Sequence, residues 1–223
     1  LDPVHIGTGG YRLGRVDNTI VREPGTNLPK IPGTSLAGAA RSYAALRYGK
    51  PESAGQHKNL KGDKSKCPII YTFGTATETG GGQRGKISIG DAQILFFPVH
   101  SMAGPVWVST KEILEEAGFQ IENADTITDG NAVTSLSWEK ENLNLGWLLL
   151  EIKTELEINP PDMISEKKEW EAVSGRIVLV APKLFSQIVS SNLEVRTSVA
   201  INPETGAAED KALFTYEAIP RAT

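Results

Sequence analysis

The chain is almost without cysteine, and it has no long apolar segment. Its single Cys67 cannot form a disulfide within the chain, and the only histidine near it in sequence is His57. A zinc site needs several Cys or His ligands at short spacings, so we expect Cys67 to be structural or inert. No apolar run approaches the ~20 residues of a membrane-spanning helix. A cationic and then apolar signal segment is missing too, so the expected location is the cytoplasm.

The bulk composition is that of an ordinary folded protein. Hydrophobic residues make up 39% and charged residues 22% of the chain. A length of 223 residues is enough to bury a full core. We expect a single domain over residues 1–223 with insertions, rather than two independent domains. Because Val4 to Ile6 looks like the exit of a strand whose beginning is absent, the N-terminal strand is expected to be incomplete.

The net charge of -4 hides a strong asymmetry along the chain. Residues 1–70 carry 11 Lys or Arg against 5 Asp or Glu, a balance of +6, whereas residues 111–171 carry 5 against 15, a balance of -10. Because salt screens charge beyond about 8–10 Å, a polyanion responds to the local field rather than to the net charge. The basic N-terminal part is therefore the candidate face for nucleic acid, although both charged runs could also be ordinary solvated surface.

The pattern of apolar residues predicts a mixed order of helices and strands. Expected strands are 86–89, 92–99, 106–109, 145–152 and 176–181, and expected helices are 36–47, capped by Thr34 or Ser35, 111–117, capped by Thr110, and 183–190. The segment 49–85 is expected to be an inserted region that is mostly loop. The turn sequence Asn202-Pro203-Glu204-Thr205-Gly206, between the apolar segments 193–201 and 212–219, predicts a β-hairpin over 192–219.

The most informative stretch runs from His5 to Arg47. It combines a glycine-rich loop, an isolated Asp17 among arginines, and a helix start with small residues. Glycines let the backbone approach a ligand closely, a helix N-terminus accepts phosphate oxygens, and arginines pair with phosphates. The sequence therefore predicts a face that binds a polyanion, with RNA as the expected ligand.

Six short segments occur in an order and at spacings that resemble a known family. They are Val4-His5-Ile6-Gly7-Thr8-Gly9, Arg15-Val16-Asp17, Pro29-Lys30-Ile31-Pro32-Gly33-Thr34-Ser35-Leu36, Ile89-Gly90-Asp91-Ala92, Leu95-Phe96-Phe97-Pro98-Val99 and Glu194-Val195-Arg196-Thr197. Together they look like the RAMP superfamily, and specifically like the backbone subunit of the type III-B CRISPR effector, the Cmr complex. The backbone subunit of the type III-A effector is a close relative and the main rival.

The resemblance implies an α+β fold, with a modified ferredoxin-like (RRM-like) core, insertions, and a long β-hairpin called the thumb. It also implies a ribonucleoprotein in which copies of the chain stack head to tail along a guide (CRISPR) RNA, together with other subunits of the effector. Each thumb would fold over the guide and splay out one nucleotide at regular intervals. Complementary single-stranded target RNA would be cut beside each such gap.

The resemblance places the catalytic aspartate of the family at Asp17. Cleavage of RNA by its own 2′-hydroxyl needs that hydroxyl deprotonated, the phosphate in line and the leaving oxygen stabilised. An aspartate with an ordinary pKa of about 3.9 is a poor base for so weak an acid. We therefore expect Asp17 to be a ligand of Mg²⁺ or Mn²⁺, with RNA phosphates supplying much of the remaining coordination. Alternatively, Asp17 only pairs with Arg12 or Arg15 and shapes the loop.

Two further residues are candidates for catalysis. His5 begins the glycine-rich loop and titrates in the useful range, so it could donate a proton or contact a phosphate, although a purely structural histidine is the alternative. Glu217, preceded by Tyr216, could approach the cut site if the hairpin folds back. Some relatives carry a more acidic and aromatic run there, whereas this chain has Ala218.

The expected RNA contacts lie in the glycine-rich loop, at the helix start and in the inserted region. They are Gly7, Gly9, Arg12, Arg15, Lys30, Gly33, Thr34, Ser35, Arg41 and Arg84. The family often has a lysine where this chain has Ala37. Arg41 and the loop lysines would have to compensate for the affinity for RNA that this lysine would provide. In the hairpin, apolar side chains could wedge against bases or simply pack the sheet; they are Val199, Ile201, Leu213 and Phe214.

Three functions of different kinds remain open. The first is a metal-dependent endoribonuclease subunit whose copies also stack head to tail into a filament along the guide RNA. The second is a non-catalytic guide-RNA-binding scaffold subunit of a type III effector, of type A or B, in which Asp17 is only structural. The third is an acidic, β-rich protein that binds a protein partner and no RNA.

Overall fold

The computed structural model describes residues 2–8, 16–55, 66–75, 82–124, 127–209 and 212–223. The chain divides into two compact units, Leu1–Pro29 with Ile94–Thr223, and Lys30–Gln93. We call the first the sheet unit and the second the helical unit, and each is described by itself. Within the described residues, no helix is long and apolar enough to cross a membrane.

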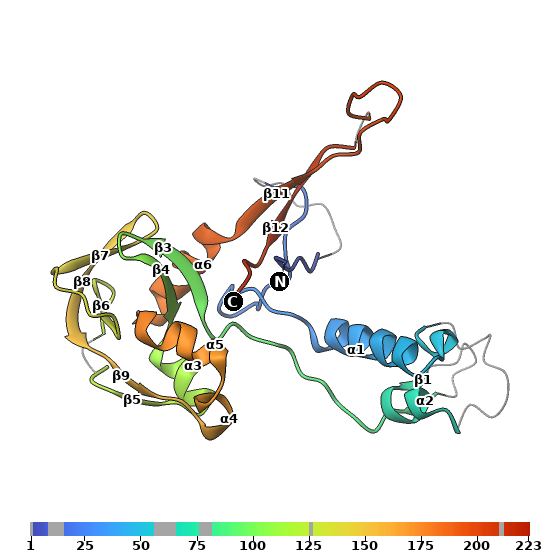
Figure 1. Cartoon of the computed structure of the whole chain (residues 1–223), viewed down its shortest axis with the longest axis horizontal. Helices are drawn as coiled ribbons and strands as arrows, with labels where there is room; N and C mark the ends of the chain where they lie inside the picture. Colours follow the sequence, from blue (N-terminus) through green and yellow to red (C-terminus); the bar gives the residue numbers. More distant parts are fainter. Residues whose placement is uncertain (1, 9–15, 56–65, 76–81, 125–126, 210–211) are drawn as a thin grey trace. The chain divides into compact units, whose positions relative to one another are not determined.

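A six-stranded mixed sheet forms the centre of the sheet unit (Figure 1). In spatial order its strands are β3 (Phe97–Ser101), β4 (Gly104–Ser109), β10 (Ile177–Leu179), β6 (Asn131–Thr134), β8 (Leu148–Glu155) and β7 (Asn142–Leu145). The pairs β4–β10 and β6–β8 are parallel, and the other neighbours are antiparallel. The predicted α+β class, with helices and a central sheet, is therefore confirmed.

The remaining elements of the sheet unit are short. They are α3 (Lys111–Glu116), β5 (Gln120–Glu122), β9 (Glu157–Asn159), α4 (Asp162–Ser165), α5 (Lys168–Val173), η4 (Ser174–Arg176), α6 (Pro182–Asn192), β11 (Glu194–Ser198) and β12 (Phe214–Ala218). Thr110 caps α3 as predicted, because its hydroxyl accepts the backbone N–H of Ile113 at 3.3 Å. The predicted helix 183–190 is also present, as α6.

Apolar core covers both faces of the six-stranded sheet. Along β10, Val178 faces one core cluster, whereas Ile177 and Leu179 face the other. Helix α6 contributes Phe185 to the first cluster, and α3 contributes Leu114 to the second. Because successive side chains of a strand point to opposite faces, a strand buried on both sides is apolar throughout and needs a covering layer on each side.

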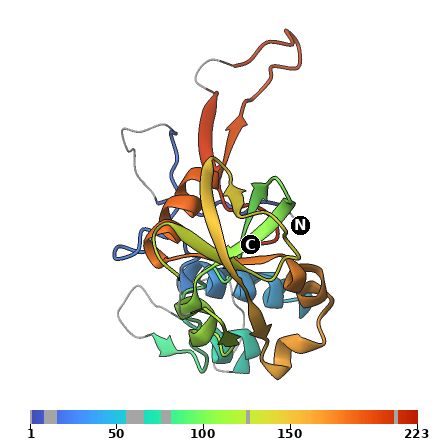
Figure 2. The ribbon, with the colours of Figure 1, turned by 90° about the vertical axis from the view of Figure 1, so that its left-hand side faces the viewer.

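Strands β11 and β12 form the predicted hairpin, which extends away from the six-stranded sheet (Figure 1 and Figure 2). Their antiparallel register runs from Glu194 opposite Ala218 to Ser198 opposite Phe214. At the predicted turn, the Asn202 side chain accepts two backbone N–H groups. This local turn chemistry reverses the chain and returns it as β12.

In the helical unit, α1 (Gly33–Arg47) packs with η1 (Pro51–Ser53) and α2 (Pro68–Phe73). A two-stranded ribbon of β1 (Gly74–Thr75) and β2 (Gln83–Arg84) accompanies them. The core of this unit is small and centres on Cys67, Ile69 and Ile70. Cys67 is a buried free cysteine, and its sulfur lies 3.3 Å from the hydroxyl of Ser53.

The predicted start of α1 is wrong. The helix begins at Gly33 rather than at residue 36, and Pro32 is its N-cap, with no side-chain capping bond. Neither Thr34 nor Ser35 therefore caps the helix. Pro32 ends the preceding segment, and a carboxylate from elsewhere in the chain, Asp91, supplies the acceptor that a cap would provide.

Other predicted segments also differ from the structure. Gly146, with a φ of 61°, turns the chain, so the expected strand 145–152 is divided between the end of β7 and the start of β8. Residues 86–89 form no strand, and the described part of 49–85 contains two short helices and a ribbon rather than mostly loop. Burial of Ile69 and Ile70 explains why α2 forms in a segment whose polar flanks predict a loop.

Two glycines of α1 should respond in opposite ways to alanine. A Cβ at Gly33 would lie 2.1 Å from the carbonyl oxygen of Ile89, so we expect Gly33→Ala to lower the free energy of unfolding by about 1–3 kcal/mol. A Cβ at Gly38 would meet nothing within 4 Å, so Gly38→Ala should raise it by about 0.5–1 kcal/mol through helix propensity. Thermal and denaturant unfolding measure both effects. Equal effects of the two variants would contradict the close packing at Gly33.

Candidate active site at the base of the hairpin

The described N-terminal residues pair with the edge of β12 that faces away from β11. Val4 and Ile219 exchange two backbone hydrogen bonds, of 3.0 and 2.8 Å. Asn18 donates its backbone N–H to the carbonyl of Thr215 at 3.0 Å and accepts the N–H of Glu217 at 3.0 Å. The segment that contains the predicted catalytic aspartate is therefore anchored to the C-terminal strand of the hairpin.

Thr215 holds Asp17 by three hydrogen bonds. The backbone N–H and the hydroxyl of Thr215 donate to Oδ2 of Asp17, at 2.7 and 3.0 Å, and the backbone N–H of Asp17 donates to the same hydroxyl at 3.2 Å. The backbone donor, followed by the hydroxyl, lowers the pKa of Asp17 below its ordinary value of 3.8. Because the side chain is exposed, Asp17 presents an ionised carboxylate to solvent at neutral pH.

His5 lies against the next residues of β12. Its Nδ1 is within hydrogen-bond distance of the carbonyl oxygen of Glu217, so Nδ1 carries the proton and Nε2 is the acceptor nitrogen of the neutral ring. The ring meets Tyr216 edge-on, with centroids 5.0 Å apart. A Cβ at Gly7 would lie 3.2 Å from Nε2, so the predicted site glycine leaves this side of the ring open.

The carboxylate of Glu217 is engaged within the protein. Both of its oxygens accept from Arg22 at 3.2 Å, and one accepts the backbone N–H of Ile20 at 3.3 Å. The two paired side chains are mostly buried, with 18% of Arg22 and 17% of Glu217 exposed. Together with Thr8 and Thr19, they line a pocket of about 410 Å³. The structure thus gives Glu217 an ion pair, and its catalytic role stays a prediction.

The described residues do not form a ready-made metal centre. No group of three or more His, Cys, Asp or Glu side chains among them is placed to hold an ion. Asp17 fits the predicted Mg²⁺ or Mn²⁺ in one respect: its donors are neutral N–H and O–H groups, so no described cation neutralises its charge. Most ligands would have to be phosphate oxygens, and a metal at Asp17 stays a prediction.

The predicted phosphate site at the start of α1 already holds a carboxylate of the chain. Oδ1 of Asp91 accepts the backbone N–H of Gly33 at 2.8 Å, and Oδ2 accepts from Nζ of Lys30 at 2.6 Å. The lysine, followed by the backbone donor, lowers the pKa of Asp91 below its ordinary value of 3.8. A phosphate would have to displace this carboxylate, so RNA contacts of Lys30 and Gly33 stay predictions.

The other predicted RNA contacts differ in their surroundings. Thr34 and Ser35 are exposed on the first turn of α1, and Arg84 is exposed on β2. Arg41 is instead tied into the helical unit, where its guanidinium donates to backbone carbonyls in η1 and β1, at 2.8 and 3.0 Å. These bonds give Arg41 a structural role that requires no RNA. Its contact with a phosphate stays a prediction. Three predicted contacts lie outside the described residues: Gly9, Arg12 and Arg15.

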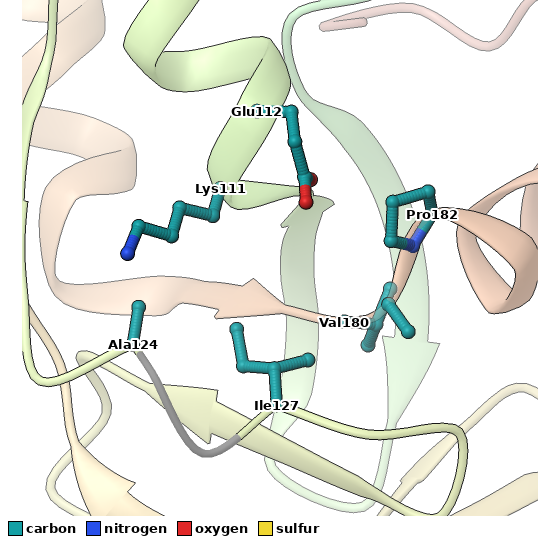
Figure 3. Close-up of a pocket in the computed structure, with 7 residues that line it drawn as sticks. Lys111, Glu112, Ala124, Ile127, Val180 and Pro182 are labelled. Carbon is teal, nitrogen blue, oxygen red and sulfur yellow. The ribbon is translucent and has the colours of Figure 1, made fainter.

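A second pocket of the sheet unit lies beside the N-terminal end of α3 (Figure 3). Its volume is about 250 Å³, and its lining includes Lys111, Glu112, Ile127 and Val180. None of the predicted site residues is among its described lining residues. It therefore does not enter the candidate active site.

The sequence of the site and the fold around it agree with a known family: the chain belongs to the RAMP superfamily, whose family model matches residues 1–222. The CRISPR system Cmr endoribonuclease Cmr4 of Pyrococcus furiosus is 32% identical over 241 residues, which cover 100% of this chain and 76% of that protein. The CRISPR system Cms endoribonuclease Csm3 of Methanothermobacter thermautotrophicus is 36% identical over 78 residues, or 34% of this chain and 30% of that protein. The predicted resemblance to the superfamily and to its type III-B backbone subunit is confirmed.

Solved structures of such subunits share the fold. The crystal structure of oligomeric Cmr4 from Pyrococcus furiosus has a TM-score of 0.57 at 25% identity, over 99% of this chain and 73% of that chain. The cryo-EM structure of the type III-B Cmr-beta bound to cognate target RNA has a TM-score of 0.66 at 15% identity, over 100% of this chain and 78% of that chain. This second likeness concerns the fold alone. The ferredoxin-like arrangement of the core stays a prediction.

Sequence reasoning missed the residues that hold Asp17, Glu217 and the start of α1 in place. Thr215 carries no motif and lies 198 positions from Asp17, so no local pattern indicates their contact. Arg22, the partner of Glu217, was one of several basic residues without a distinguishing neighbour. Asp91 lies in one of the segments of the family resemblance, which is the signal that could have drawn attention to it.

Acid should destabilise the helical unit partly through Asp91. Because the fold lowers the pKa of this carboxyl, its ionised form contributes stability above the ordinary pKa of 3.8, and the contribution is lost as the pH falls through the lower folded value. We expect Asp91→Asn to lower the melting temperature at neutral pH and to make it less sensitive to pH between about 5 and 2.

The matched control is Asp162→Asn, which replaces an exposed carboxylate on α4 that accepts no hydrogen bond from the described residues. It should leave the melting temperature and its pH dependence unchanged. Melting curves at several pH values measure both variants. Parallel pH dependences of the wild type and D91N would contradict the role of Asp91.

Proposed function

We propose that this chain is the guide-RNA-binding backbone subunit of a type III-B CRISPR ribonucleoprotein, which cleaves complementary target RNA at regular intervals. The observation that carries the proposal is Asp17, an exposed carboxylate fixed at the base of a hairpin in a member of the RAMP superfamily. The relative that aligns with the whole chain is named an endoribonuclease. The proposed partners are guide RNA, target RNA, further copies of the chain stacked head to tail, and other subunits of the effector.

The proposed reaction is attack of a 2′-hydroxyl of the target RNA on the neighbouring phosphate. Asp17, with phosphate oxygens of the RNA, would hold Mg²⁺ or Mn²⁺. Such an ion lowers the pKa of an oxygen that it binds and offsets negative charge on the phosphate. The 2′-hydroxyl would give up its proton to solvent water as its oxygen bonds to phosphorus. The attack displaces the 5′-oxygen of the next nucleotide, which takes up a proton, so the products would end in a 2′,3′-cyclic phosphate and a 5′-hydroxyl.

His5 supplies a group that can move a proton in this reaction. Its Nδ1 is engaged with the carbonyl of Glu217, which leaves Nε2 for proton transfer. When protonated, Nε2 could donate to the departing 5′-oxygen.

The hairpin supplies apolar side chains that fit RNA bases. Val199, Ile201, Leu213 and Phe214 are 42%, 54%, 66% and 40% exposed. Several exposed apolar side chains on one hairpin favour a ligand that covers them. Bases have flat apolar faces that stack on or against such side chains. The hairpin is therefore proposed to wedge between bases and to set the interval between cuts.

A guide-RNA-binding scaffold without catalysis is the second candidate. The three bonds between Asp17 and Thr215 favour it specifically, because they give the carboxylate a structural use without any substrate. Both candidates require RNA binding that weakens steeply with added salt, since phosphate contacts release counterions. Salt-insensitive RNA binding would contradict both.

Asp17→Ala should abolish cleavage by the assembled complex, because it removes the carboxylate that is proposed to hold the ion. We expect the single-turnover rate to fall at least ~100-fold, the size of effect seen when one stabilising group of an active site is removed. Assembly on guide RNA should be retained. End-labelled target RNA measures the rate and the spacing of fragments. Asp162→Ala on α4 is the control and should cleave normally, whereas cleavage by D17A at the wild-type rate would favour the scaffold.

Polar substitution of the hairpin's apolar side chains should reduce cleavage without preventing assembly. For the double variant Ile201→Ser with Leu213→Ser, we expect at least a ~10-fold fall in cleavage rate, since one stacked base contributes about 1–3 kcal/mol. The control is Met163→Ser, a side chain on α4 that is 84% exposed. The same labelled target measures the rate. Unchanged rate and spacing in the hairpin variant would contradict the wedge.

A further inference from the structure

Every polar group of Thr215 is used to hold the segment that carries Asp17. Its backbone N–H and its hydroxyl donate to Oδ2 of Asp17, its hydroxyl accepts the Asp17 N–H, and its carbonyl accepts the N–H of Asn18. These four distances lie between 2.7 and 3.2 Å. Thr215 therefore fixes the backbone and the side chain of Asp17 together.

The Thr215 hydroxyl restrains the orientation of the Asp17 carboxylate in a way that the backbone N–H alone cannot. A lone backbone donor at one oxygen leaves the carboxylate free to rotate about that bond. The hydroxyl adds a second donor to the same oxygen, and it is itself held by the Asp17 N–H. With two donors on Oδ2, the other oxygen of an otherwise exposed side chain points in a defined direction.

Thr215 lies on β12, so the same bonds join Asp17 to the hairpin. Its partner across the hairpin is Thr197 of β11. A displacement of β12 would therefore carry the Asp17 carboxylate with it. An error of about 1 Å in the position of a reacting group can lower a rate by ~100-fold, so such a link has consequences for cleavage.

We propose that Thr215 is a positioning residue for RNA cleavage, whose hydroxyl fixes the Asp17 carboxylate to the hairpin. The inference rests on the proposed function, because it requires Asp17 to act in cleavage. It adds that Asp17 and Asn18 move together with β12. The backbone donor of Thr215 survives any substitution, so the hydroxyl accounts for part of the positioning only.

The test compares Thr215→Val, which keeps the shape of the side chain and removes the hydroxyl, with Thr215→Ser, which keeps the hydroxyl. In the complex assembled on guide RNA, we expect T215V to lower the single-turnover cleavage rate ~10-fold, with the half-saturating target concentration unchanged. T215S should restore the rate to within about threefold of the wild type. The matched control is Thr197→Val, the same substitution on the opposite strand, at an exposed side chain, and it should cleave normally.

Hydrogen exchange of the Asp17 amide gives a readout that does not depend on cleavage. In the purified full chain, this amide donates to the Thr215 hydroxyl, so its exchange should be slow in the wild type and T215S and faster in T215V. If T215V does not assemble, Thr215→Ala removes the same hydroxyl and replaces it in both measurements.

The outcomes separate this inference from the function on which it rests. If T215V cleaves at the wild-type rate while D17A is inactive, the positioning role is overturned and the proposed function stands. If T215V and T197V lose activity equally, or T215S does not recover it, the hydroxyl has no special part and the positioning role is again overturned. If D17A cleaves normally, the proposed function fails, and the positioning role fails with it.

Discussion

The pairing of the outer edge of β12 is the constraint on which the candidate site depends. A strand edge presents N–H and C=O groups that must find partners, and β11 covers only one edge of β12. The described N-terminal residues cover the other edge, at Val4 and Asn18. The same edge places Asp17 at Thr215 and His5 at the carbonyl of Glu217. One pairing, between segments about as far apart in sequence as this chain allows, therefore positions all three catalytic candidates.

Among the described residues, the two aspartates with lowered pKa values, Asp17 and Asp91, differ in whether a cation offsets their charge. Oδ2 of Asp91 pairs with Lys30, so the pair carries no net charge. Oδ1 of Asp91 accepts the backbone N–H of Gly33 at the start of α1. The donors to Asp17 are a backbone N–H and a hydroxyl, both neutral. Its negative charge is thus uncompensated among the described residues. Of the two, Asp17 is therefore the carboxylate for which a divalent cation is proposed.

What the sequence predicts well is what nearby residues decide. The Thr110 cap of α3 and the Asn202 turn of the hairpin depend on contacts within a few positions, and both are as expected. The family resemblance pointed to Asp17 without indicating which strand would hold it. The bonds from Thr215 to Asp17 and from Asp91 to Gly33 depend on the folded chain, because their partners are 198 and 58 positions apart. No periodicity or composition encodes such pairs.

The alternation of side chains along β12 explains how one strand can serve both the candidate site and the proposed contact with RNA. Thr215 and Glu217 point to one face, where Thr215 meets Asp17, and Phe214 and Tyr216 point to the other, with ring centroids 6.1 Å apart. Because the side-chain period of a strand is 2, a slip of one residue would exchange the two sets. The register of the hairpin therefore determines which rings lie on the face opposite Thr215 and whether Asp17 has a hydroxyl partner. In the proposed function, this register would fix the distance between Asp17 and the part of the hairpin that contacts bases.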